Sequence, residues 1–138
     1  MSKEEILNFI KQHNLAVIST VNNINAPQSA VVEFGELNDL TIIIDTLKTS
    51  RKYINLQAND KVAVVIGWDK DITIQIDGVA KELEGAELGL AQEAYFAKNP
   101  RARKWQTKPD IAYFAISPKW LRYSDVSKQP WQIEEFEF

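Results

Sequence analysis

The apolar positions of this chain follow two different periods. Near the N-terminus they recur at helical spacing, and Ser2 and Glu5 have the Ser-x-x-Glu arrangement of a helix capping box. We therefore expect an amphipathic helix over residues 3–13. Most of the remaining apolar residues form β-branched runs or alternate strictly with polar ones, as in residues 72–77, and both patterns are typical of strands.

Short turns rich in Asn, Asp and Pro separate the strand-like segments. Strands are expected over residues 15–21, 28–36, 40–45, 61–68, 72–83 and 111–117, with a further piece at 120–123. Gly78 is expected to form a bulge, and Pro118 to break the strand that starts at Ile111. The amphipathic tail over 131–138 is either an edge strand or a segment that covers a partner.

Two short helices are expected among these strands, at residues 53–58 and 86–98. Because the strands follow one another through tight turns, they form an antiparallel meander and not parallel units with helical crossovers. The sequence therefore predicts a mainly β fold, a small closed or nearly closed barrel of about six strands with few helices.

The composition of the chain excludes several classes of site and partner. The chain has 138 residues, which suits one domain spanning 1–138, and its net charge of -3 argues against nucleic acid as a partner. It has no cysteine, which excludes a thiolate metal site and a cysteine nucleophile. His13 is the only histidine and is expected to contact the end of the first helix. No signal-like leader or spanning apolar run is present, so a cytoplasmic protein without a membrane partner is expected.

The densest group of candidate binding residues follows the strand expected at 40–45. Thr46, Ser50, Arg51 and Lys52 lie there, around the first turn of a short helix. Free amides and the positive end of the helix dipole favour a phosphate at such a place, and both basic side chains would contact it. The alternative is that Thr46 or Thr49 only caps the helix and that Arg51 and Lys52 are solvated surface charges.

The order of these motifs resembles that of the pyridoxamine 5′-phosphate oxidase-like family of FMN-binding split barrels, over about residues 5–125. Thr46 with Ser50-Arg51-Lys52, then Gly67-Trp68, then Asp77-Gly78 carry the resemblance. It implies a six-stranded antiparallel split β-barrel of Greek-key type, and a homodimer that holds FMN between its subunits. The four phosphate-site residues match the family's own, and the strand at Val31 and Val32 would line the isoalloxazine ring.

The chain also departs from the family pattern. Ala30 and Gly35 stand where true pyridoxamine-phosphate oxidases carry an arginine and a lysine. The family's flavin-contacting glutamine aligns with Thr73, for which Gln75 could substitute, and Tyr123 falls near a family tryptophan. The chain therefore resembles a short, divergent member similar to the general-stress branch, and not a vitamin B6 enzyme.

Three functions are open at this point. The first is an FMN-dependent oxidoreductase, with FAD or deazaflavin as alternative cofactors, that acts on an unknown small-molecule substrate. The second is a non-catalytic flavin- or deazaflavin-binding module; haem is disfavoured because His13 is the lone histidine ligand. The third is a structural dimer with a degenerate site. The basic cluster at residues 100–105 is expected to be a solvated helix end, with RNA, a nucleotide or a second cofactor phosphate as alternative contacts.

Overall fold

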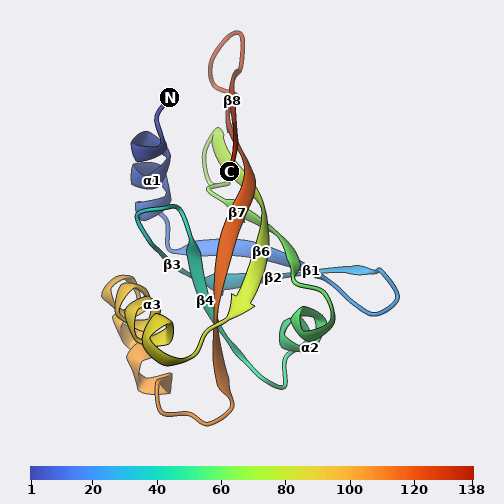
Figure 1. Cartoon of the computed structure of the whole chain (residues 1–138). Helices are drawn as coiled ribbons and strands as arrows, with labels where there is room; N and C mark the ends of the chain where they lie inside the picture. The colour runs from blue at the N-terminus through green and yellow to red at the C-terminus, as the bar shows by residue number, and fades with distance from the viewer.

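In the computed structural model, which describes residues 1–138, all the strands belong to one antiparallel sheet of eight strands (Figure 1). The strands are β1 (Leu15–Val21), β2 (Pro27–Glu33), β3 (Gly35–Glu36), β4 (Ile42–Leu47), β5 (Lys61–Ile66), β6 (Ile72–Glu82), β7 (Ile111–Asp125) and β8 (Gln132–Glu137). The helices are α1 (Lys3–Lys11), α2 (Arg51–Ala58), α3 (Gly85–Lys98) and the 3-10 helix η1 (Pro100–Trp105).

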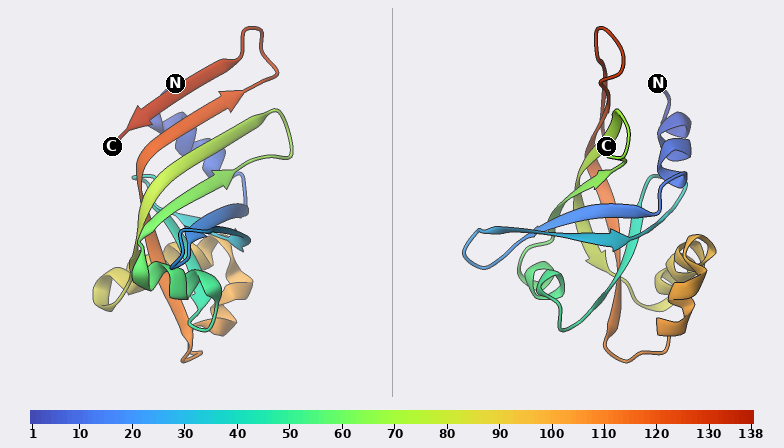
Figure 2. Two further views of the ribbon diagram at one scale, coloured as in Figure 1. Left: turned by 90° about the vertical axis from the view of Figure 1, so that its right-hand side faces the viewer. Right: turned by 180° about the vertical axis from the view of Figure 1, so that it is seen from behind.

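The strand order is β2-β1-β5-β6-β7-β4-β3, and β8 also pairs with β7. The first half of β7 pairs with β4 and its second half with β8, while β6 runs along most of its length. The sheet curls strongly as a result, and β1 and β2 cross the long strands, behind them in Figure 1 and in front of them in the right-hand view of Figure 2. The predicted antiparallel split barrel with few helices is confirmed.

The helices and strands expected from the sequence are present, but several begin or end at other residues than expected. Strand 28–36 divides at the buried Phe34, and the tail forms the edge strand β8, so the sheet has eight strands and not about six. The helix expected at 53–58 begins earlier, at Arg51, because the Ser50 side chain caps it. The capping box of Ser2 and Glu5 is confirmed.

Pro118 does not break its strand, contrary to expectation. It lies opposite Gly78, where the register of β6 against β7 shifts between Asp77 and Gly78. A bulge already disrupts the ladder at this point, so the missing N–H of proline is tolerated there. The bulge expected at Gly78 and the interruption expected at Pro118 are therefore one irregularity in the pairing of β6 with β7. The strand β7 continues through it.

Two apolar clusters hold the fold together. The larger has 22 buried residues, and α1 closes it with Ile6, Leu7 and Ile10. The smaller has 7 buried residues and joins α3 and η1 to β4 and β7. No helix is both long and apolar enough to cross a membrane.

Candidate functional site

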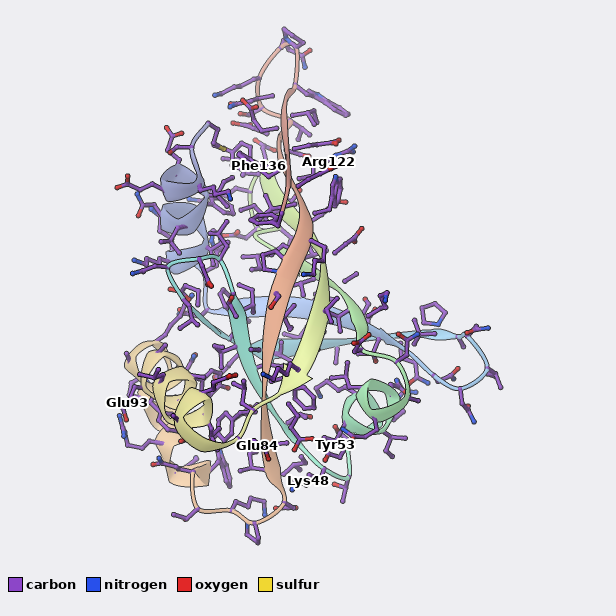
Figure 3. The ribbon with its side chains drawn as sticks, in the orientation of Figure 1. Lys48, Tyr53, Glu84, Glu93, Arg122 and Phe136 are labelled. Atoms are coloured by element: carbon purple, nitrogen blue, oxygen red, sulfur yellow. The ribbon has the colours of Figure 1, made fainter.

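The corner between β4 and α2 carries the predicted hydroxyl pair. Thr46 ends the buried part of β4, and its Oγ1 lies 2.7 Å from the Oγ of Ser50. The same Ser50 oxygen accepts a hydrogen bond of 3.2 Å from the amide of Tyr53. The two hydroxyls have two hydrogens and share one bond, so one hydrogen remains for an acceptor from outside the chain. Figure 3 labels Lys48 and Tyr53, which flank this corner.

Two basic side chains complete the corner. Arg51 is exposed and Lys52 is half-buried, and neither takes part in an ion pair within the chain. As the first two residues of α2, they have amides without an acceptor in the helix. The corner thus contains a helix cap together with donors and cations that remain available. The residue that caps the helix is Ser50, and not Thr46 or Thr49 as the capping alternative had it. The two interpretations of this segment are compatible, because this cap leaves Arg51 and Lys52 without a partner in the chain.

Two pockets meet at Lys52. The smaller, of about 120 Å³, is lined by Arg51 and Lys52 on one side and by Gln28, Ser29 and Ala30 on the other. The larger, of about 560 Å³, lies between β2 and β4, and residues of α3, η1 and the start of β7 close its far side. Val31, Val32, Thr46 and Ser50 line this larger pocket. Its volume is in the range of small-molecule sites.

The larger pocket also has an acidic wall that the sequence did not reveal. Asp45 and Glu33 line it beside Tyr95. Burial raises the pKa of the Asp45 carboxyl, the Tyr95 hydroxyl opposes this, and the charge of Glu33 raises the pKa further. Burial also raises the pKa of the Tyr95 hydroxyl far above its usual value, and the charge of Asp45 adds to that shift.

Thr73 and Gln75 lie away from both pockets. They belong to the outward face of the sheet, where a cross-strand row joins Val31 through Val17, Val65 and Gln75 to Arg122. Three strand spacings separate Val31 from Gln75, roughly 15 Å. Along β7, Gln75 pairs with Arg122 and Thr46 pairs with Ala112, near the opposite end of the strand, so Thr73 and Gln75 do not meet Thr46 within one chain. Figure 3 labels Arg122 at the far end of this row, on β7 next to β8.

Tyr123 also lies elsewhere. It is buried within the larger apolar cluster, and its ring meets the ring of Phe9 edge-on at 5.9 Å. The inward direction follows from its place on β7, opposite Ile74 on the core face of β6. Because its ring is covered by protein, we leave Tyr123 out of the proposed cofactor site.

Positions 30 and 35, where the family carries cations, have different surroundings. Ala30 lines the smaller pocket beside Arg51, so a longer side chain there would point toward the phosphate corner. Gly35 packs against α3, and a Cβ at this position would lie 2.8 Å from the Cα of Tyr95. A lysine at position 35 would require α3 to move, whereas position 30 is sterically open to a cation.

Most of the 13 residues that line the larger pocket were not predicted from the sequence. Asp45 had a detectable signal, since it is a charge that directly follows a buried apolar run. Tyr95 looked like part of a helical apolar stripe. Trp105 ends η1 and Lys108 follows it, in a segment whose sequence has no regular apolar pattern. The cations of the basic cluster, Arg101, Arg103 and Lys104, are exposed and do not line the pocket, whereas Ala102 and Trp105 of the same segment do.

His13 is not part of either pocket. Its Nδ1 lies 2.9 Å from the carbonyl oxygen of Phe9, and its Nε2 lies 3.7 Å from Asp69. The expected role at the end of the first helix is confirmed.

Comparison with known proteins adds a family context. Residues 2–125 match the family model described as pyridoxamine 5′-phosphate oxidase. Pyridoxine/pyridoxamine 5′-phosphate oxidase 2 of Hydrogenovibrio crunogenus is 30% identical over 140 residues, covering 99% of this chain, and the chain spans only 62% of that enzyme. General stress protein 26 of Bacillus subtilis is 25% identical over 137 residues, covering 96% of this chain and 95% of that protein.

The fold also has a close structural counterpart. A heme binding protein from Mycobacterium smegmatis superposes with a TM-score of 0.85 at 17% identity, covering 99% of this chain and 58% of that one. At this level of identity the similarity concerns the fold alone.

Proposed function

Since the chain belongs to the pyridoxamine 5′-phosphate oxidase family, we propose that it is an FMN-binding flavoprotein, an FMN-dependent oxidoreductase acting on an unidentified small molecule. The family commonly binds FMN. The observation that carries the proposal is the unpaired cation Lys52 at the junction of a small polar pocket and a larger one. FMN likewise joins a compact phosphate to a large flat ring.

The residues of the corner fit the phosphate. Arg51 and Lys52 would neutralise it, and the remaining hydroxyl hydrogen of Thr46 and Ser50 would donate to it. The larger pocket, with Val31 and Val32 on one wall, would take the ring. When bound, FMN supplies the electron-transfer chemistry, while the chain binds and orients it.

A true pyridoxamine-phosphate oxidase activity is not part of the proposal. Ala30 and Gly35 provide neither of the cations that such enzymes carry there, and the chain spans only 62% of its oxidase relative. General stress protein 26, matched along nearly its whole length, is the better guide to the type of protein. We therefore propose a small-molecule substrate and do not assign its identity.

We further infer that the protein is a homodimer. The outward face of the sheet presents Val17, Val31 and Val65 in one cross-strand row, and Val31 is 61% exposed. A second copy packed on this face would cover these valines. In such a dimer, Thr73 and Gln75 of one copy would be able to contact a ligand bound in the pocket of the other copy, which they do not reach within their own chain.

The main alternative is a flavin- or deazaflavin-binding module that does not turn over. Bound FMN that accepts no electrons from NADH or NADPH would favour it. Haem has less support than flavin, although a structural counterpart binds it, because His13 is bonded to its own helix and lines neither the phosphate corner nor the larger pocket.

The direct test replaces both cations. Arg51→Ala with Lys52→Ala removes two charge-assisted contacts of about 1.5–3 kcal/mol each, so we expect the Kd for FMN to rise by about 100-fold or more. Isothermal titration calorimetry measures it. Lys61→Ala with Lys70→Ala is the matched control, because both are exposed lysines outside the two pockets. An unchanged Kd in the Arg51/Lys52 variant would refute the site.

A further inference from the structure

We propose that Gln28 is a phosphate-binding residue of the smaller pocket, and that the buried Asn55 is the positioning residue that turns its N–H donors toward the ligand. The inference rests on the proposed function in so far as the phosphate belongs to FMN. Gln28 lies on β2 and Asn55 on α2, the two elements that face each other across this pocket. Neither residue belongs to the motifs that carry the family resemblance.

The pairing of β1 with β2 brings Gln28 to the side of the sheet on which α2 lies. Gln28 is the cross-strand partner of the buried Thr20, and the next residue of β2 on that face, Ala30, is opposite the buried Ile18. The helix α2 packs against β1 there. Gln28 is half-buried, so part of its side chain contacts the protein interior while the rest lines the pocket.

The side-chain amide of Asn55 determines which atoms of its neighbours remain free. Asn55 is 6% exposed, and its Nδ2 donates hydrogen bonds of 2.9 Å to Oγ1 of Thr20 and of 2.9 Å to Oε1 of Gln28. The carbonyl end of the Gln28 amide is therefore held against the protein. The other end, Nε2 with its two hydrogens, makes no hydrogen bond within the chain and is left for the pocket that Gln28 lines.

Thr20 independently indicates that this pocket binds a hydrogen-bond acceptor. Its side chain lines the pocket and is almost completely buried, and its oxygen already accepts the bond from Asn55. The hydrogen of its hydroxyl has no acceptor within the chain. Buried polar groups are nearly always satisfied, so this hydrogen is expected to be donated to a ligand or an ordered water. The single amide of Asn55 thus makes donors of both Thr20 and Gln28.

The charge of the pocket wall favours an anion as the acceptor. None of the residues that line the pocket is acidic, and two of them, Arg51 and Lys52, are basic. Ser29 adds a further donor, because its Oγ lies 2.7 Å from that of Ser19 and the two hydroxyls keep one hydrogen to spare. Two cations surrounded by neutral donors match the charge of about -1.5 to -2 that a phosphate monoester carries at pH 7.

The ¹⁵N signals of the Gln28 side-chain amide test the contact directly. Flavin-free, ¹⁵N-labelled protein is titrated with inorganic phosphate, and the signals are assigned by their loss in Gln28→Glu. We expect them to move together with the backbone amides of Arg51 and Lys52, whereas sodium chloride of equal ionic strength should not move them. Gln28 signals that stay in place, whether or not those of Arg51 and Lys52 move, would overturn the proposal.

Affinities for FMN and riboflavin test the two roles in the flavin complex. Gln28→Ala removes a hydrogen bond to a charged group, so we expect FMN to bind about tenfold more weakly and riboflavin to bind unchanged. Asn55→Ala should lower the same affinity ratio, and most of its effect should vanish when Gln28→Ala is already present, because it acts through Gln28. Gln57→Ala, at an exposed position of α2 outside both pockets, is the matched control and should leave the ratio unchanged.

An effect of Asn55→Ala that is equally large with and without Gln28 would refute the positioning role. If Asn55→Ala does not fold, hydrogen exchange of the Asn55 side-chain amide in the unmodified protein decides instead. It should be much slower than that of the exposed Asn38, and equal rates would refute the network. If the protein binds no FMN, the proposed function fails, while the phosphate titration of flavin-free protein still decides on Gln28.

Discussion

Single residues decide how strongly the corner between β4 and α2 attracts an anion. Ala30 and Gly35 both lack the expected cation, and only the position of Ala30 opens toward Arg51 and Lys52. Asp45 and Glu33, on the far wall of the larger pocket, are acidic and repel an anion instead. The site therefore has a polarity set by a few side chains, and each can be changed separately.

Restoring a cation at position 30 should strengthen FMN binding. Ala30→Arg places a third positive charge at the smaller pocket, and we expect the Kd for FMN to fall about tenfold, equivalent to about 1.4 kcal/mol. Fluorescence titration of FMN measures it. Ala30→Gln serves as the control, since it adds length without charge. Equal effects of the two substitutions would show that charge at position 30 is irrelevant.

Asp45 should lower stability at neutral pH. Burial raises the pKa of its carboxyl in the folded state. A group with a raised folded-state pKa stabilises the fold at low pH, and that contribution is lost as the pH rises through the folded pKa. We therefore expect Asp45→Asn to have a larger free energy of unfolding than the unmodified protein at pH 7. The gain should shrink toward pH ~4, where aspartate is normally half-protonated.

Urea denaturation of the flavin-free protein at several pH values measures this difference. The side chains that shift the pKa of Asp45 are Tyr95, Glu33 and Lys52, from three different elements, and Tyr113 faces Asp45 from the paired strand β7. An Asp45→Asn variant that is less stable at pH 7, or whose gain does not depend on pH, would contradict the assigned cause. Stability lost at a carboxyl that lines a pocket is the usual trade-off of a functional group.

At the scale of elements, local patterns were predictable and their junctions were not. The range of β1 follows directly from its β-branched run, and the start of α1 from the capping box. Pro118 was misread because the effect of a proline depends on its partner strand, and the Gly78 bulge opposite it lies 40 residues away in sequence. Likewise, Ser50 was expected near the start of α2, but only the three-dimensional cap fixes Arg51 as its first residue.

The same distinction applies to the candidate site. Thr46, Ser50, Arg51 and Lys52 are close in sequence, so their shared corner could be inferred from a strand followed by a helix. Tyr95, Trp105 and Lys108 reach the pocket only because α3 and η1 pack against β4 and β7. Long-range packing of this kind leaves no periodic signal in a single sequence. Thr73 and Gln75 remain predictions that depend on a second copy.

At the scale of the whole molecule, the proposed dimer depends on the outward face of β1, β2, β5 and β6. Val65 lies in the centre of the row on this face and outside both pockets. We expect Val65→Glu to convert a dimer into a monomer, because two buried carboxylates would face each other across the symmetric contact. Light scattering coupled to gel filtration measures the mass.

Leu90→Glu is the matched control, since Leu90 is 74% exposed on α3, away from this face. Loss of the dimer in the control alone would place the interface on α3 instead. If the unmodified protein is a monomer, the homodimer proposal is wrong.

If a phosphate binds where β4 passes into α2, the protein should distinguish FMN from riboflavin. The two molecules differ only by that phosphate, so calorimetric titration of the unmodified protein isolates its contribution. With two charge-assisted contacts from Arg51 and Lys52, we expect FMN to bind at least about 100-fold tighter than riboflavin. Equal affinities for the two flavins would contradict it.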